Sequence, residues 1–324
     1  SEMCIRDRNR IMARNSKFSK NTLFYQVFHS PEFSDYQEAF YPSRMIRSLL
    51  QIYPLRASRW LLGLDTTVLV DTLNCLSDRI RQKTEFYVPL GESSGVYPFV
   101  IGGRKPFVLL IPGGAYAEVC PLNEGFMMAL ALNRMGWNAF VCKYRVGKEA
   151  HFPNPQDDVA DCLQRIFQNA AQMEVNTEDY AVCGFSAGGH LAASWGAKAL
   201  GYRKYALPRP KTIILAYPVI TMGRKTHNLS RKNLLGDRQD DPEYQRLYSI
   251  ENQVDAEYPD TFLWACEADK CVPFENTRLM AEALRKSGCR VEVRSYKGTA
   301  HGWGLAAGTP ANGWLTQAID FWQS

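Results

Sequence analysis

One serine of the chain stands in the pattern typical of a nucleophile, Gly184-Phe185-Ser186-Ala187-Gly188. An apolar run at 180–183 precedes it and a helical pattern follows it, so Ser186 is expected at a tight strand-to-helix turn. Such a turn accepts only small neighbours, which the two glycines provide. The N-terminus of the helix would stabilise negative charge that develops during attack. The pattern predicts that Ser186 is the nucleophile of an acyl transfer; an ordinary helix-capping serine is the alternative.

A second glycine-rich turn, Ile111-Pro112-Gly113-Gly114-Ala115-Tyr116, follows the apolar run at 107–111. Because glycine has no side chain, backbone N–H groups here can approach a substrate oxygen. An acyl-transfer enzyme needs two such donors for the oxyanion of its tetrahedral intermediate. We expect the donors to come from Gly114 or Ala115 together with Ala187. The alternative is a plain glycine turn.

A histidine and a carboxylate complete this chemistry in chain order. Asp269 follows the apolar run at 261–265, and His301 lies in a glycine-flanked loop after the run at 291–295. A carboxylate at Asp269 would accept the Nδ1–H of His301 and fix its tautomer, leaving the other ring nitrogen as the base. Glu267 is the rival acid. His190, four residues after Ser186, is expected to be structural.

The remaining histidines and cysteines indicate no metal. None of the five His or nine Cys has zinc-type spacing, and no phosphate-binding loop motif occurs. The expected chemistry therefore needs no metal and no organic cofactor. The odd number of cysteines, several of them in apolar runs, favours reduced thiols in a cytoplasmic protein.

The pattern of apolar runs predicts an α/β protein. Near-continuous apolar runs that alternate with amphipathic stretches indicate a mostly parallel central sheet with helices on both faces. In such sheets ligands bind at the carboxyl ends of the strands, where all the motifs above fall. Strands are expected at 86–88, 96–101, 107–111, 139–142, 180–183, 212–216, 261–265 and 291–295, and helices at 43–62, 66–80, 122–135, 155–171, 187–200, 275–287 and 313–322.

The N-terminal part differs from the rest. Residues 1–20 hold six basic and two acidic side chains, so most of the net charge of +5 lies there. We interpret 1–20 as a flexible basic tail rather than a nucleic-acid site, 21–84 as a helical extension or cap, and 85–324 as the catalytic domain. No apolar run is long enough to span a membrane and no signal peptide is evident. The apolar extension could also form a homo-oligomer interface.

The motifs together carry a resemblance that covers residues 85–324. This region resembles the esterase and lipase-like branch of the α/β-hydrolases, which includes bacterial acetyl-xylan-type and feruloyl-type carbohydrate esterases. Many relatives open the oxyanion loop with His-Gly-Gly-Gly, whereas this chain has Pro112 first and Ala115 last. The supporting motifs are Pro112 to Tyr116, Lys143-Tyr144-Arg145-Val146, 152–158, 184–192, Asn233-Leu234-Leu235-Gly236, 269–273 and His301-Gly302-Trp303.

The resemblance implies a two-step hydrolysis of a small-molecule ester through an acyl-enzyme on Ser186. By analogy, 221–248 would form a lid, and an acetyl group on a sugar would be the substrate. A serine peptidase or amidase of the same fold is the first alternative, and a non-catalytic binding protein is the second. Candidate pocket residues are Tyr116, Phe185, Val219, Val272 and Trp303.

Overall fold

The computed structural model describes residues 17–36, 39, 66–299 and 301–324, and its parts divide into two compact units at Phe86 and Tyr87. The second unit is built on one eight-stranded sheet. Its strand order is β1-β2-β4-β3-β5-β6-β7-β8. The pairs β1–β2 and β2–β4 are antiparallel, and all the other neighbouring pairs are parallel. The mostly parallel sheet expected from the sequence is confirmed.

Most strands lie within two residues of the predicted runs, but β5 begins five residues before the run expected at 180–183. They are β1 Val88–Pro89, β2 Gly95–Phe99, β3 Lys105–Ile111, β4 Asn138–Lys143, β5 Val175–Phe185, β6 Thr212–Ala216, β7 Asp260–Cys266 and β8 Val291–Tyr296. Every residue of β6 is buried, as are the last five of β3 and the last six of β5 and β7. Burial on both faces explains why these strands read as unbroken apolar runs rather than as alternating ones.

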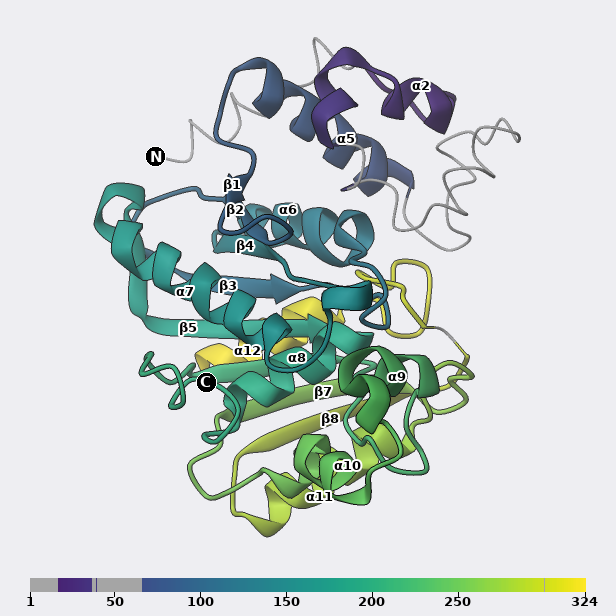
Figure 1. Cartoon of the computed structure of the whole chain (residues 1–324). Helices are drawn as coiled ribbons and strands as arrows, with labels where there is room; N and C mark the ends of the chain where they lie inside the picture. The colour runs from purple at the N-terminus through teal and green to yellow at the C-terminus, as the bar shows by residue number, and fades with distance from the viewer. Residues whose placement is uncertain (1–16, 37–38, 40–65, 300) are drawn as a thin grey trace. The chain divides into compact units, whose positions relative to one another are not determined.

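Helices cover both faces of this sheet. Figure 1 shows α7 Asn154–Met173 and α8 Ser186–Gly196 in front of the strands, with α12 Trp314–Gln323 behind them. The same unit also contains α6 Met127–Arg134 and α11 Glu275–Lys286, and α9 Asn228–Leu235 and α10 Pro242–Tyr248 follow β6. α8 is buried along its whole length, since it lies over the centre of the sheet.

Two helices differ from their predicted bounds. The helix expected at 122–135 begins with a π-helical turn, Leu122–Phe126, before α6. The helix expected at 187–200 begins at Ser186 and ends at Gly196, after which Ala197 takes an extended conformation. An added Cβ at Gly201 would lie 2.0 Å from the carbonyl oxygen of Trp195, so the chain folds back tightly there. Apolar periodicity continues through such a turn and cannot mark its position.

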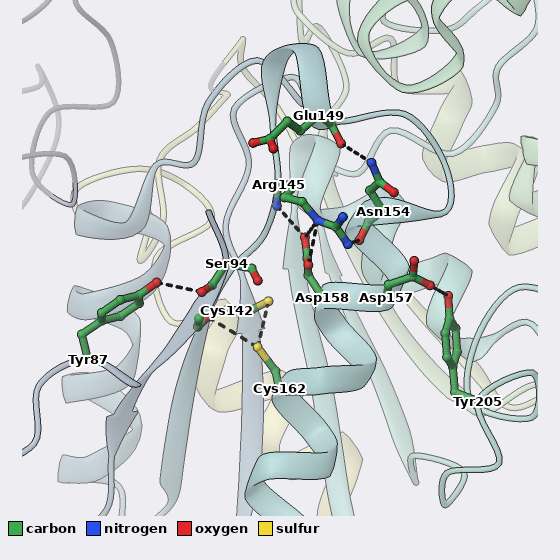
Figure 2. Close-up of polar contacts among 11 residues, drawn as sticks. Tyr87, Ser94, Cys142, Arg145, Glu149, Asn154, Asp157, Asp158, Cys162 and Tyr205 are labelled. Atoms are coloured by element: carbon green, nitrogen blue, oxygen red, sulfur yellow. Dashed lines mark hydrogen bonds and ion pairs between the residues drawn. The ribbon is translucent and has the colours of Figure 1, made fainter. Parts of the chain in front are cut away.

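An ion pair fixes the loop that follows β4. The Arg145 guanidinium donates through Nε to both carboxylate oxygens of Asp158 on α7 at 3.0 Å, and the Arg145 backbone N–H also donates to Asp158. A further bond runs from Arg145 to the carbonyl of Asn154 (Figure 2). Asp158 is 1% exposed, whereas the Arg145 side chain is 28% exposed, so the carboxylate is shielded from solvent and its partner is only partly so. The pair anchors the neighbouring Tyr144, whose hydroxyl donates to the carbonyl of Pro112 at 2.7 Å.

The first unit contains α2 Phe24–Phe28, a 3₁₀ turn Pro31–Tyr36 and α5 Thr66–Arg81, which lies where a helix was expected at 66–80. Lys17 pairs with Glu32 at 2.6 Å, and Ser77 of α5 donates to the same carboxylate. The helix expected at 43–62 and most of the tail 1–20 lie outside the described residues. Among the helices that the structure describes, none is long and apolar enough to cross a membrane.

Candidate active site

Ser186 lies at a tight turn between β5 and α8. Its φ of 51° is in the left-handed region, which is costly for a residue with a side chain. The turn leaves no room for larger neighbours: an added Cβ at Gly184 would lie 2.3 Å from the carbonyl oxygen of Gly188, and one at Gly188 would lie 2.2 Å from that of Ile111. The glycines on both sides of Ser186 are therefore required by backbone packing.

Three residues from separate strand ends form a hydrogen-bonded chain. The Ser186 hydroxyl lies 2.9 Å from Nε2 of His301, and Nδ1 of His301 lies 2.7 Å from Oδ2 of Asp269. The other oxygen of Asp269 accepts the backbone N–H groups of Cys271 at 2.8 Å and Val272 at 3.0 Å. Because Asp269 accepts the Nδ1 proton, Nε2 is left to accept the proton of Ser186. This is the geometry of a nucleophile, a base and an orienting acid.

The rival acid lies elsewhere. Glu267 is exposed, and its carboxylate accepts the hydroxyl proton of Ser295 at 2.9 Å. Asp269 is the carboxylate that reaches His301, and its side chain is fully buried while that of His301 is 16% exposed. Of the two acids that the sequence left open, the geometry favours Asp269.

The oxyanion loop packs directly against the turn that holds Ser186. An added Cβ at Gly113 would lie 2.9 Å from Cβ of Ser186. Gly114 (φ 134°) and Ala115 (φ 58°) follow in left-handed conformations. Within the described chain, no acceptor is recorded for the backbone N–H groups of Gly114 and Ala115, and Ala187 stands in the first turn of α8, where N–H groups have no intrahelical acceptor. These three predicted donors thus lie around the Ser186 turn.

Side chains from two other elements, Asn233 of α9 and His190 of α8, hold the oxyanion loop. Asn233 of α9 donates to the carbonyl of Ala115 at 2.9 Å, and the Tyr116 hydroxyl donates to Nδ1 of His190 at 2.9 Å. Nε2 of His190 donates to the carbonyl of Tyr248 at 2.8 Å. Burial lowers the pKa of His190 to about 4, so the ring is neutral and fits this donor–acceptor pattern. The structural role predicted for His190 agrees with these contacts.

The predicted pocket residues occupy different environments. Tyr116, Phe185, Val219 and Val272 are at most 2% exposed, and only Trp303 is partly exposed. Phe185 packs against Tyr217 and Trp314, which is the packing of a core side chain. Trp303 lies two residues after His301. The assignment of these five residues to a substrate pocket stays a prediction.

Two features of the site had no signal in the sequence. The carboxylate of Glu124 and the hydroxyl of Tyr217, 93 residues apart, are 2.8 Å from each other beneath the oxyanion loop. In addition, the Cys271 thiol lies 3.8 Å from Nε2 of His227, and it also interacts with His301. Neither pairing follows a spacing rule, because each joins residues that only the fold brings together.

The charge on His301 depends on these neighbours. Burial alone would lower the pKa of His301, but the Asp269 carboxylate and the Cys271 thiol outweigh burial and raise it above the ordinary value. Hydrogen bonds from His227 and His301 lower the pKa of Cys271 to about 6, against the opposing effect of burial. A base works only when unprotonated, so activity is expected to rise at a pH above the ordinary histidine value of about 6.5.

Cys271→Ser is expected to move the acidic limb of the pH–rate profile to lower pH. The substitution removes a thiolate that stabilises protonated His301, so the pKa of His301 falls and the base becomes available earlier. The kcat/KM of an ester substrate, measured from pH 5 to 10, reports this shift. Cys289→Ser, at a partly buried thiol bonded to the carbonyl of Asp255, is the matched control. Superimposable limbs for Cys271→Ser and the wild-type protein would contradict the expectation.

The sheet order and the Ser186–His301–Asp269 constellation at its strand ends define an α/β-hydrolase fold. The BD-FAE family model matches residues 97–284, and the chain belongs to this family. A crystal structure of an acetyl ester-xyloside bifunctional hydrolase from Caldicellulosiruptor lactoaceticus is similar with a TM-score of 0.64 and 30% identity, over 73% of this chain and 93% of that one.

Two relatives are similar in sequence. Endo-1,4-beta-xylanase B of Butyrivibrio fibrisolvens is 33% identical over 220 residues, and the acetylxylan esterase of Xylanibacter ruminicola is 29% identical over 216 residues. Each match covers 65% of this chain, but only 34% and 44% of the respective relative. The chain therefore spans less than half the length of these two proteins.

Proposed function

We propose that this chain is a carboxylic ester hydrolase that cleaves esters of small acyl groups through an acyl-enzyme on Ser186. The observation that carries the proposal is the hydrogen-bonded chain from Ser186 through His301 to Asp269, with the oxyanion loop packed against the serine. Names of relatives support the same chemistry, since an acetylxylan esterase and an acetyl ester-xyloside hydrolase are among them.

In the proposed mechanism, His301 takes the proton of the Ser186 hydroxyl as the serine oxygen attacks the ester carbonyl. The oxyanion accepts hydrogen bonds from the backbone N–H groups of Gly114 or Ala115 and of Ala187. His301 then gives its proton to the departing alkoxide, which leaves as the alcohol. A water attacks the acyl-enzyme while His301 accepts its proton, and return of that proton to Ser186 releases the acid. Asp269 stabilises the charged imidazole throughout.

The substrate that we propose is an acetyl ester of a carbohydrate. It rests on the relatives named above, which include an acetylxylan esterase and an acetyl ester-xyloside hydrolase. Residues 221–248 are proposed as the lid, because Asn233 contacts the oxyanion loop and His227 contacts Cys271 beside the acid. We further propose that 85–324 is the catalytic domain and that 21–84 is an accessory extension.

Hydrolysis of p-nitrophenyl acetate, butyrate and octanoate tests the proposal. We expect kcat/KM to be greatest for acetate and to fall with chain length, since the relatives named above include an acetylxylan esterase and an acetyl ester-xyloside hydrolase. Acetylated xylo-oligosaccharides would then be assayed by release of acetate. An aminoacyl p-nitroanilide serves as the comparison substrate. Turnover of the anilide without turnover of any ester would replace this proposal with a peptidase or amidase.

A further inference from the structure

A fully buried carboxylate lies beneath the oxyanion loop. Glu124, on the π-helical turn before α6, is 3% exposed. Its Oε2 accepts the backbone N–H of Gly113 at 2.7 Å, and its Oε1 accepts the hydroxyl proton of Tyr217 at 2.8 Å. No lysine or arginine forms an ion pair with it in the part of the chain that the structure describes. A buried acid without a basic partner is costly, so this one is expected to have a role.

Tyr217 extends the connection to the loop that carries His301. Its hydroxyl accepts the backbone N–H of Gly304 at 3.0 Å, and its ring centroid lies 4.9 Å from that of His301. The neighbouring Asn123 donates to the carbonyl of Gly302 at 2.8 Å. One continuous set of hydrogen bonds therefore runs from the oxyanion loop through two side chains to the histidine loop.

The donors in this set require a carboxylate. Gly113 and Gly304 contribute N–H groups, and the Tyr217 hydroxyl accepts from Gly304, so its own proton must go to Glu124. Both oxygens of Glu124 therefore face donors. A glutamine would turn an NH₂ group toward one of those donors and leave at least one buried proton without an acceptor.

We propose that Glu124 and Tyr217 are positioning residues for the ester hydrolysis proposed above, and that they fix the oxyanion loop and the His301 loop relative to each other. Their hydrogen bonds go to each other and to backbone N–H groups of the two loops, and Tyr217 meets His301 by ring packing. For the reaction, the Ser186 oxygen has to lie between the oxyanion donors and the base. The donors at Gly114 or Ala115 and the base His301 stand on two loops that are about 190 residues apart in sequence. A rigid buried link between the two loops is the kind of support on which such geometry depends.

The charge on Glu124 gives the link a second effect. Burial raises the pKa of Glu124 above its ordinary value, and the bonds from Tyr217 and Gly113 and the charge on His301 offset this rise only in part. By the same interaction, negative Glu124 favours protonated His301. The other groups that face His301 are Asp269, Cys271 and Tyr217. The groups that face Glu124 are the thiols and phenols of Cys120, Tyr144, Cys183 and Tyr217. Burial raises the pKa values of these four groups, so they are neutral.

The test compares Glu124→Gln and Tyr217→Phe in the full chain. Glu124→Gln should lower kcat about tenfold to a hundredfold with little change in KM, since a misaligned catalytic group costs up to about a hundredfold in rate. Tyr217→Phe should also lower kcat, and the double variant should lose less than the product of the two single losses, because both substitutions break one link. Tyr258→Phe, which removes a buried hydroxyl bonded to the carbonyl of Ala193, should keep the wild-type kcat.

The pH profile distinguishes the proposed role of Glu124, which includes the effect of its charge on His301, from a simple loss of protein stability. Loss of the negative charge in Glu124→Gln should move the acidic limb of kcat/KM to lower pH by about half a unit or more, whereas Tyr217→Phe keeps the carboxylate and should move the limb less. Wild-type kcat for Tyr217→Phe would overturn the inference even if Glu124→Gln fails to fold. Independent, multiplicative losses in the double variant would also overturn it. An inactive wild-type protein would instead overturn the proposed function.

Discussion

Ser186→Ala is expected to lower kcat for p-nitrophenyl acetate by roughly ten-thousand-fold or more, as removal of the nucleophile does in other serine hydrolases. The alanine has no oxygen to form the acyl-enzyme, whereas the oxyanion donors and the fold remain. A small residual rate above the uncatalysed reaction would come from those donors. A burst of p-nitrophenol equal to the enzyme concentration, seen in the wild-type protein and absent in the variant, would identify the acyl-enzyme directly.

Ser194→Ala is the matched control for this prediction. Ser194 lies on the same helix and is also buried; its hydroxyl donates to the carbonyl of Leu191 at 2.7 Å and accepts from Nε2 of Gln156 at 3.1 Å. Its replacement removes the same atom without touching the reaction, so kcat should stay within about threefold while stability falls by about 1 kcal/mol. If Ser186→Ala keeps the wild-type rate, the acyl-enzyme mechanism is wrong.

Asp269→Asn is expected to lower kcat by up to about ten-thousand-fold. The amide can present its NH₂ group to Nδ1 of His301, which then holds its proton on Nε2 and cannot accept one from Ser186. The buried side chain also loses the charge that stabilises the imidazolium. The rate loss should be seen at every pH, because the fault lies in the tautomer and not only in the pKa.

Glu267→Gln tests the alternative acid. This side chain is exposed, and its replacement should leave kcat near the wild-type value and weaken only the contact with Ser295. The two variants make the same chemical change two residues apart in one loop. A large loss in Glu267→Gln with little loss in Asp269→Asn would reverse the assignment that the geometry favours.

The sequence predicted those parts of the site that a local pattern encodes. Each chemically important residue follows an apolar strand, and a parallel sheet brings such strand ends to one edge. This explains why Ser186 and His301, 115 positions apart, could be expected together before their 2.9 Å contact was seen. The tight turn at Gly184 and Gly188 was predictable because steric exclusion of a Cβ leaves a visible preference for glycine.

The buried supports of the site could not be predicted in this way. Glu124 falls within a stretch that reads as one amphipathic helix, and only the π-helical turn places its carboxylate under Gly113. Tyr217 follows β6 as one more aromatic in an apolar run. Hydrogen bonds between such residues depend on backbone placement to within a few tenths of an ångström, which periodicity does not contain.

The contact between α9 and the oxyanion loop has a consequence for engineering this protein. On the side of Ser186 that faces the sheet, the glycines cannot be replaced, because an added Cβ at Gly113, Gly184 or Gly188 would lie within 3 Å of other atoms. The opposite side is joined to the catalytic loops mainly through side chains, such as that of Asn233 on Ala115. A library confined to the exposed side chains of 221–248, which leaves its core residues Met222, Leu234 and Tyr248 unchanged, should therefore yield variants with altered substrate preference that still fold. A library in the glycine turns should yield mostly unfolded chains.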